Sequence, residues 1–402
     1  MRYILYAIVF VFTLLNAPTV HAKDVHYYLT AGMNGIVRMH DGNTFPVWGF
    51  REGMRPMWSI SVPGPTIRAS EEDHVFLHFF NMSMLPHTIH PHGLDVPQDV
   101  DGVPQTSFEI PMMGTYTYDF IAPHAGTYGY HCHVHTVLHL QMGMYGTVVI
   151  ESPDGKKTVW EGGPAYDIER IWGTGEFDSY WHENAGGFGM GMGMWRRGGF
   201  GMWMSSGSAL RGGHHGGGMG PGDAGGMGPG DGGGMWPGDG GGMWPGDGGG
   251  MGPGDGGGMG PGDGGGIGPG GGQNSGFPFH DYNPDYFIVN GKSGKDIQRD
   301  PESKVEMDVD QTLLLRLVNI GGYLPHRFIF NGLQATAVSS DGRPLPIQET
   351  VDEITLYPGE RYDVIVQPDS IGDYQVDIEY LSIYDESVQG IASVPIVVRD
   401  SF

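Results

Sequence analysis

The sequence predicts an all-β protein with two β-sandwich domains that flank a long glycine-rich segment. Stretches in which apolar and polar residues alternate, or in which β-branched and aromatic residues cluster, recur from about residue 25 to 180 and again from about 277 to 402. This pattern is typical of short strands separated by turns. With 402 residues, 39% of them hydrophobic, but with 73 glycines and 29 prolines, the chain can form about two cores and a spacer.

Eight stretches show the strand pattern most clearly, and short strands joined by turns favour a sandwich. We set the domains at residues 23–185 and 277–402. The predicted strands are His74–Asn81, Thr115–Ile121, Thr127–Val134 and Thr147–Glu151 in the first domain and Leu313–Ile320, Arg361–Gln367, Tyr374–Tyr380 and Ser393–Arg399 in the second.

Between the domains, residues 186–276 consist largely of Gly, Met, Pro and Asp, and an eight-residue unit, Met-(Gly/Trp)-Pro-Gly-Asp-Gly-Gly-Gly, recurs within them. Glycine maximises the entropy lost on ordering and proline removes a hydrogen-bond donor from each repeat, so we expect a disordered linker without a core. Six methionines recur in phase: Met219, Met227, Met235, Met243, Met251 and Met259.

The N-terminus has the pattern of a signal peptide. Arg2 precedes an apolar run from Tyr3 to Leu15, and Val20-His21-Ala22 forms a small-residue cleavage site before Lys23. The run is too short for a comfortable membrane span, and no later stretch approaches the roughly 18 apolar residues that a spanning helix needs. We therefore expect residues 1–22 to be removed and the protein to be exported, periplasmic or secreted, without a membrane span.

Charge and cysteine content exclude some functions. A formal net charge of -25 leaves no basic face to neutralise phosphates, which argues against nucleic acid as a partner. The chain has one cysteine, Cys132, so it cannot form an intrachain disulfide even in an oxidising compartment. The lone thiol therefore calls for another explanation.

Two segments of the first domain are rich in metal-binding side chains. One runs from His87 through His90 to His92, and the other begins His131-Cys132-His133 and ends at Met144. Because side chains alternate faces along a strand, we expect the two histidines of the second segment to point one way and Cys132 the other. One strand would then serve two metal sites.

A thiolate, two imidazoles and a weak thioether form the ligand set of a blue, type 1 copper site. On the Cys132 side, His139 and Met144 are expected on the loop after the strand, and His87 supplies the second imidazole. On the opposite face four imidazoles converge and suit one or more further copper ions; they are His90, His92, His131 and His133.

At these two motifs the sequence resembles the multicopper oxidase family. In that family, His-x-x-His-x-His and His-Cys-His followed by His-x-x-x-Gly-Met supply the type 1 copper and half of a trinuclear cluster that reduces oxygen to water. Electrons pass from the type 1 copper through the cysteine to its flanking histidines. The resemblance implies two cupredoxin-like Greek-key β-sandwich domains. It assigns His87, Cys132, His139 and Met144 to type 1 copper and His90, His92, His131 and His133 to the cluster.

Further motifs agree with this resemblance. In the family, the aspartate of Asp-Gly-Val-Pro assists proton delivery, which makes Asp101 the candidate catalytic residue; the alternative is that it caps the turn. The second domain resembles the metal-free cupredoxin domain of the family and contains no cysteine and two histidines, His280 and His326. The matching stretches are Val62–Arg68, Asp101–Pro104 and Gly126–Tyr130 in the first domain and Val289–Lys292, Leu315–Asn319, Ser340–Gly342 and Pro358–Val364 in the second.

The sequence departs from the family in two respects. Six residues separate Cys132 from His139, two more than the common laccase spacing, although copper nitrite reductases tolerate a longer ligand loop. Only two of the four His-x-His pairs that a trinuclear cluster requires are present. We therefore expect a homo-oligomer in which another copy supplies the missing half, for example across a symmetric dimer contact.

Other candidate ligands have simpler interpretations. His135 extends the second segment, but the family leaves that position to ordinary loop residues. We expect His74, His78 and His124 to be surface or packing residues and His326 to pack at a strand end. The in-phase methionines, with a second cluster from Met190 to Met204, are either spacer residues or weak ligands for Cu(I), which prefers soft thioethers.

Three functions follow from these patterns. The first is an oxidase that takes electrons from a small molecule or Cu(I) and passes them to oxygen. The second is a copper-binding or electron-transfer protein for copper tolerance. The third, ranked last, is a copper nitrite reductase, because the single-histidine spacing typical of that class is not followed. The sequence does not identify the reductant.

Overall fold

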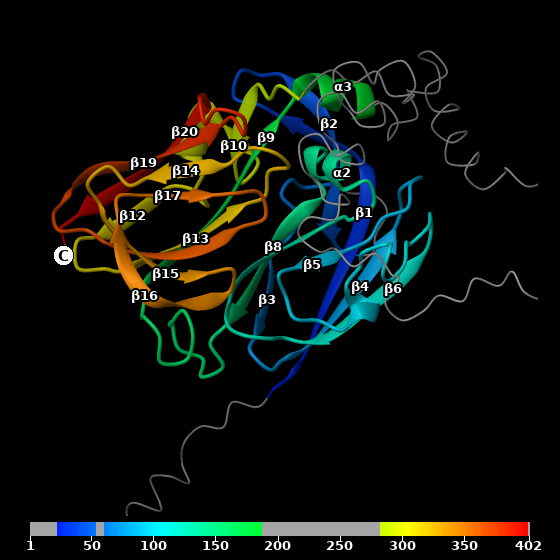
Figure 1. The fold of residues 1–402 in the computed structure, drawn as a ribbon, viewed down its shortest axis with the longest axis horizontal. Helices are drawn as coiled ribbons and strands as arrows, with labels where there is room; N and C mark the ends of the chain where they lie inside the picture. Colours follow the sequence, from blue (N-terminus) through cyan, green and yellow to red (C-terminus); the bar gives the residue numbers. More distant parts are fainter. Residues whose placement is uncertain (1–21, 54–59, 187–281, 401–402) are drawn as a thin grey trace, which may run out of the picture. The chain divides into compact units, whose positions relative to one another are not determined.

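The computed structural model describes residues 22–53, 60–186 and 282–400 (Figure 1). The predicted signal segment up to residue 21 and residues 187–281, which hold the methionine repeat, lie outside the described residues. No helix in the described part of the chain is both long enough and apolar enough to span a membrane.

The first β-sandwich is built from two four-stranded sheets, with strand orders β2-β1-β4-β6 and β3-β8-β7-β5. Its inner faces meet through aromatic side chains, such as Phe50 of β2 and Tyr130 of β7, whose ring centroids lie 5.5 Å apart. The strands are β1 (Asp24–Arg38), β2 (Thr44–Glu52), β3 (Ile67–Ser70), β4 (His74–Asn81), β5 (His90–His92), β6 (Thr115–Ile121), β7 (Gly126–His131) and β8 (Tyr145–Glu151).

Alternation along β4 shows why these residues form a half-buried strand. Val75, Leu77 and Phe79 are at most 2% exposed, whereas the residues between them are partly exposed. Branched and aromatic side chains on one face bury apolar area against the opposite sheet, and the other face stays in water.

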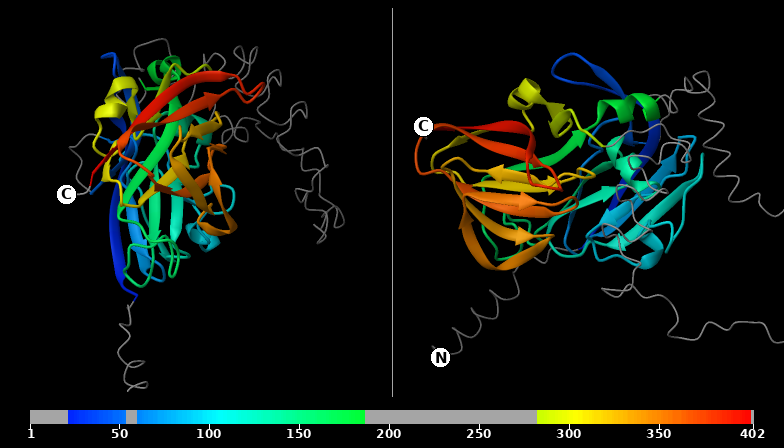
Figure 2. Two further views of the ribbon diagram at one scale, coloured as in Figure 1. Left: turned by 90° about the vertical axis from the view of Figure 1, so that its left-hand side faces the viewer. Right: turned by 45° about the horizontal axis from the view of Figure 1, so that its top comes forward.

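Short helices interrupt the strands of the first sandwich. A 3-10 helix, η1 (Gln98–Val100), follows β5, and α2 (Thr136–Gln141) lies between β7 and β8. α3 (Ser179–Gly186) lies beside β2 (Figure 2). Phe45 of β2 and His182 of α3 have ring centroids 6.2 Å apart.

The second β-sandwich has a seven-stranded sheet of order β11-β10-β9-β13-β18-β15-β16 and a five-stranded sheet of order β12-β20-β19-β14-β17. Its central strand, β13, is buried along its whole length. The strands are β9 (Ile168–Phe177), β10 (Tyr286–Val289), β11 (Lys292–Ser293), β12 (Val305–Asp308), β13 (Leu313–Asn319), β14 (His326–Ile329), β15 (Gln334–Ser340), β16 (Arg343–Val351), β17 (Glu353–Leu356), β18 (Arg361–Gln367), β19 (Gly372–Leu381) and β20 (Val388–Arg399), with a 3-10 helix, η4 (Gly294–Arg299), after β11.

Strand β9 precedes residue 185, where the first domain was predicted to end, yet it belongs to the seven-stranded sheet of the second sandwich. It pairs in parallel with β13 and antiparallel with β10. The chain thus enters the second sandwich before residues 187–281 and continues it afterwards. The methionine-rich segment is therefore connected to two strands of one sheet rather than to one strand in each sandwich.

A buried polar network joins the two sandwiches beside β7. Arg316 of β13 is 1% exposed, and its guanidinium donates hydrogen bonds to Glu169 Oε1 at 2.6 Å and to Thr127 Oγ1 at 2.9 Å. The Thr127 hydroxyl in turn donates to Asp363 Oδ1 at 2.5 Å. Because Thr127 lies on β7, this network holds the second sandwich against the strand that leads to Cys132.

Candidate metal centres

Cys132 directly follows β7, which ends at His131, three residues before the predicted end at Val134. The backbone N–H of Cys132 donates to the carbonyl oxygen of Met144 at 3.0 Å, so pairing with the returning chain still holds it in place. The expected alternation of side chains persists beyond the strand. The rings of His131 and His133 lie on one side, with centroids 5.8 Å apart, and Cys132 belongs to a separate cluster of candidate ligands.

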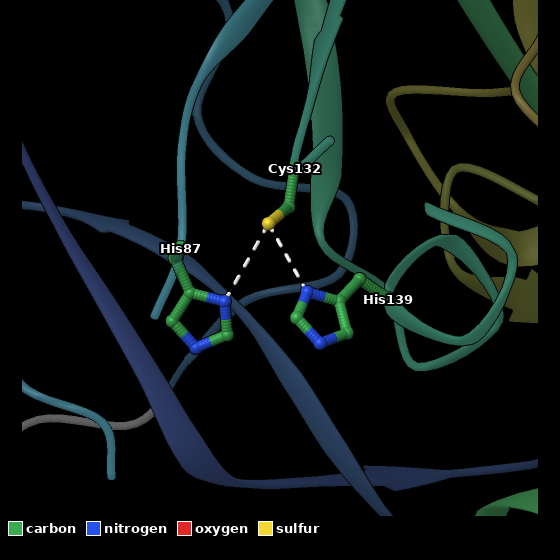
Figure 3. A group of neighbouring side chains, drawn as sticks. All are labelled: His87, Cys132 and His139. Carbon is green, nitrogen blue, oxygen red and sulfur yellow. Dashed lines mark hydrogen bonds between the residues drawn. The ribbon is translucent and has the colours of Figure 1, made fainter. Parts of the chain in front are cut away.

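The first centre consists of Cys132, His87 and His139, which converge from three segments of the chain (Figure 3). The Sγ atom of Cys132 lies 3.5 Å from Nδ1 of His87 and 3.1 Å from Nδ1 of His139. His87 is held by two backbone hydrogen bonds with Ile110, at 3.1 and 3.0 Å. All three side chains are fully buried.

Helix α2 positions the last two predicted ligands, where the sequence analysis expected a loop. His139 lies within the helix, and Met144, which is 0% exposed, donates its N–H to the carbonyl oxygen of His139 at 2.9 Å. Between them Gly143 has a φ of +106°, and a Cβ there would lie 2.6 Å from Val62 Cγ2. Glycine is therefore needed for the chain to leave the helix and bring the backbone of Met144 beside Cys132.

Burial keeps the groups of the first centre uncharged. It lowers the pKa of His87 to about 3 and places the pKa of His139 well below its ordinary value. It also raises the pKa of the Cys132 thiol to about 12, which the N–H of Thr88, 3.5 Å from Sγ, partly opposes. Neutral imidazoles are ready to bind a metal, and the thiol binds by exchanging its proton for the cation.

The donor set fits copper. The two Nδ1 atoms face the sulfur, whereas the buried Nε2 atoms of His87 and His139 have no hydrogen-bond partner. A cation between the three donors therefore requires no change of ring orientation. Two imidazoles and one thiolate are the strong ligands of blue copper, and Met144, whose carbonyl oxygen accepts from the N–H of Cys132, is the candidate for the weak thioether ligand.

The second group lies on the opposite side of the same segment and contains four histidines. In the antiparallel pairing of β5 with β7, His90 lies opposite His131, and His92 is two residues along on the same face. The ligand nitrogens of these three residues lie within 4.8 Å of one another. His133 completes the group, with its ring centroid 5.2 Å from that of His90.

Two neighbouring segments shape the four-histidine group. His90 donates from Nδ1 to the carbonyl oxygen of Asp101 at 2.7 Å, and a carboxylate oxygen of Asp101 lies 3.3 Å from the same nitrogen. Gly102, with φ of +70°, makes this approach possible, because a Cβ would lie 2.0 Å from the carbonyl oxygen of Ile89. Asp101 therefore follows η1 in a tight turn and also contacts a candidate ligand.

On its other side, the group meets the second sandwich. Burial and the guanidinium of Arg361 lower the pKa of His92 to about 4. A Cβ on Gly359 would lie 3.0 Å from Nε2 of His92, so this glycine closely covers the ring. Within the described residues, the second sandwich thus supplies a cation and a glycine next to His92, and no imidazole.

The structure brings together seven of the eight predicted ligand side chains, in two groups on the expected sides. The eighth residue, Met144, is buried, and its backbone bonds to Cys132 and His139. The sequence analysis missed Thr88, whose N–H faces Cys132 Sγ and whose hydroxyl oxygen accepts from the N–H of His133 at 3.1 Å. Its place between His87 and His90 was the available signal. It also missed Trp48, whose ring centroid lies 5.3 Å from that of His139, and Arg361, which no local pattern connects to a histidine on β5.

The remaining histidines take different positions. His135 is exposed and is the N-cap residue before α2, with φ of 45°, and its ring centroid lies 6.1 Å from that of His139. His326 is the first residue of β14, as predicted, and its buried ring contacts Thr174 Oγ1 at 2.7 Å and Glu176 Oε2 at 3.1 Å. His124 is an exposed residue near Glu71.

Two β-sandwiches and a buried cysteine, histidine and methionine set define a metal protein of the cupredoxin class. Two family models, both described as multicopper oxidase, match residues 48–155 and 270–394, which together are more than half of the chain. The chain belongs to the multicopper oxidase family, whose cofactor is copper.

Relatives and solved structures agree with this membership. Copper resistance protein A of Pseudomonas syringae pv. tomato is 40% identical over 94 residues, which are 23% of this chain and 15% of that protein. The chain thus matches a small part of this relative. Blue Copper Oxidase from Nitrosomonas europaea superposes with a TM-score of 0.58 at 22% identity, covering 94% of this chain and 86% of that one. Copper nitrite reductase from the same organism gives 0.57 at 16% identity, covering 94% and 95%. These two similarities show the fold.

Proposed function

We propose that this chain is a copper-dependent oxidoreductase that accepts single electrons at His87, Cys132, His139 and Met144 and delivers them to oxygen at the four-histidine group. Copper bound in the two groups would supply the one-electron chemistry and the oxygen chemistry. The chain's own residues hold the metal, exclude water and connect the two groups.

One observation carries this proposal: consecutive residues belong to different groups. Cys132 Sγ lies in the first group, and the rings of His131 and His133 lie in the second. The path between the groups is therefore a few covalent bonds through the backbone of Cys132. Complete burial of the first group excludes water from the donor set and favours a rigid site.

Proton delivery is the role we propose for Asp101. Its carboxylate lies 3.3 Å from His90 Nδ1 and is 30% exposed, so it touches both the four-histidine group and solvent. A carboxylate in that position can carry protons from water to the site where oxygen would be reduced.

The four-histidine group is half of a trinuclear site, so the proposal requires a homo-oligomer. The side chain of His90 is 17% exposed, and His92, His131 and His133 are also partly exposed, so a second copy has access to the group. A further part of the proposal is export through residues 1–22, which suits a copper enzyme with one buried thiol and no disulfide.

The decisive experiment combines a copper count with visible absorption, EPR, oxygen consumption and native mass on the full chain. The oxidase predicts more than one copper per chain, a blue band, a coupled cluster and an oligomer. A monomer that consumes oxygen at a competent rate would refute the shared cluster, and one copper per chain without oxygen consumption would refute the oxidase.

The second candidate is a copper-binding or electron-transfer protein for copper tolerance. Arg361 favours it, because a cation beside His92 opposes loading of several copper ions within one chain. The name of the relative copper resistance protein A is consistent with this role. One blue copper, at most one further copper and no oxygen consumption would identify it. A nitrite reductase ranks third, because its likeness here is one of fold.

A further inference from the structure

Histidines also gather on the outer face of the first sheet, outside both groups described above. Parallel pairing of β1 with β4 places His26 beside Phe76 and Tyr28 beside His78. His26 and His78, which are 52 residues apart in the sequence, become diagonal neighbours. Because His26 is exposed and His78 is partly exposed, neither ring belongs to the core.

The two imidazoles face each other end to end. Nδ1 of His26 lies 3.1 Å from Nε2 of His78, and the ring planes differ by 2°. The ring centroids lie 5.4 Å apart, about the largest separation that this N···N distance allows for two five-membered rings. The two nitrogens therefore lie on the line between the rings, and one N–H points at the lone pair of the other ring.

Neighbouring side chains hold both rings in this orientation. His26 stacks on Phe76 with centroids 4.7 Å apart, and His78 stacks on Tyr28 at 4.6 Å. The other nitrogen of His78, Nδ1, lies 3.0 Å from Thr117 Oγ1 on β6. When Nδ1–H donates to this hydroxyl oxygen, the lone pair of His78 is at Nε2 and faces His26.

We propose that His26 and His78 form a further metal site, which binds a monovalent d10 cation, Cu(I) or Ag(I), between Nδ1 of His26 and Nε2 of His78. Such cations accept two collinear nitrogen ligands. Within the described residues, the pair is not part of any larger group of His, Cys, Asp and Glu ligands, as a four-coordinate zinc would require. The inference does not depend on the proposed oxidase.

Binding requires two small changes. A metal–imidazole bond is about 2 Å long, so the nitrogens must separate from 3.1 Å to about 4 Å, which the exposed His26 can accommodate. The proton between the rings moves from Nδ1 to Nε2 of His26, so no proton is released. His74 lies on the same face of β4, and two carboxylates contact it, Asp24 of β1 and Asp119 of β6. They add negative charge near the site.

Nuclear magnetic resonance of the ring nitrogens tests this site on the full chain labelled with 15N-histidine, titrated with Ag(I) because silver is redox-inert. Signals are assigned with His26→Asn and His78→Asn. We expect one ring nitrogen from each residue to shift together, at silver concentrations that leave His124 unshifted. In His26→Asn, the silver concentration at the midpoint of the His78 shift should rise more than about tenfold, because one of the two ligands is gone. Thr117→Val should also raise it at least about tenfold, since loss of a hydrogen-bond partner behind a metal ligand costs about that much affinity.

The matched control is His74→Asn, which removes a histidine from the same face and should leave the paired shift intact. The proposal is overturned if the signals of His26 and His78 do not respond to silver, if they respond no earlier than His124, or if His78 responds equally in His26→Asn. Unchanged circular dichroism of each variant confirms that the sandwich is folded.

Discussion

The Nδ1 atom of His131 lies 3.1 Å from the carbonyl oxygen of Cys132, the residue that follows it. When Nδ1–H donates to this oxygen, the lone pair of His131 is at Nε2, which lies 3.1 Å from Nδ1 of His92. The residue that directs a sulfur into the first group thus also orients a ring of the second. The two groups therefore share the backbone of Cys132, whereas their side chains are separate and can be replaced one at a time.

Replacing Cys132 by serine should abolish the intense visible band of the copper-loaded protein and lower its copper content by one ion per chain. Serine has no thiolate for the copper, and two buried imidazoles do not complete the site. Absorption and metal analysis provide the measurement. His135→Asn, an exposed neighbour in the same segment, should keep both. A blue band in Cys132→Ser would show that the thiol is not the ligand.

Met144→Leu should keep the copper but raise its reduction potential, because loss of the thioether donor destabilises the oxidised ion. Met142→Leu is a matched control, since both methionines are 0% exposed and lie two residues apart. Each exchange should cost less than about 1.5 kcal/mol in stability. Equal potentials in the two variants, measured by redox titration of the blue band, would remove Met144 from the ligand set.

Asp101→Asn should reduce oxygen consumption by about a hundredfold or more if the carboxylate transfers protons. The blue band should not change, because Asp101 contacts His90 and not the first group. Asp99→Asn is the control within the same turn, since the Tyr116 hydroxyl bonds to the carbonyl oxygen of Asp99 and not to its side chain. Full activity in Asp101→Asn would leave this residue with a turn-capping role alone.

Arg316→Met should destabilise the metal-free protein by about 3–5 kcal/mol in urea unfolding, because it leaves the buried Asp363 carboxylate without the arginine that pairs with it. The partly exposed Glu169 keeps its pairing with Arg68. Arg327→Met removes an arginine that is 30% exposed and pairs with Glu379, and should cost no more than about 1 kcal/mol. Similar losses in the two variants would mean that the buried network does not hold the sandwiches together.

Acid should destabilise the protein partly through His182. Burial lowers its folded-state pKa from 6.5 to about 4, so the unfolded state binds more protons below pH 6.5. Stability from this residue is present above pH 6.5 and is lost as pH falls. The loss between pH 7 and pH 5 is about 2 kcal/mol. In His182→Gln, urea unfolding of the metal-free protein should depend less on pH by that amount, and an unchanged dependence would contradict the assignment.

Much of the fold could be predicted because local patterns determine half-buried strands. The predicted limits of His74–Asn81, Thr115–Ile121 and Arg361–Gln367 agree with β4, β6 and β18. The limits fail where tertiary contacts take over. β7 stops at His131 because the chain turns into α2, and β9 joins the second sheet through pairings with residues more than 100 positions away.

The ligand groups were predictable for a similar reason. Alternation separates Cys132 from His131 and His133, and short spacing places His139 and Met144 in the same segment. His87 lies 45 residues before Cys132, and its motif with His90 and His92 was the signal that connected it to the sulfur. Copper ligation by these residues stays a prediction until the metal is measured. Arg361 beside His92 could not be predicted, because only the packing of one sandwich on the other brings these residues together.

By itself, the sequence determined the all-β class, because half-buried strands depend on residues close together in the chain. It also predicted a spacer between the two strand-rich regions and the division of eight candidate ligands into two groups, each from short local motifs. The tertiary structure decided which strands share a sheet, what covers the four-histidine group and how His26 comes to face His78. Those relationships depend on sheet pairing and on packing between sandwiches, which join residues that no local spacing connects.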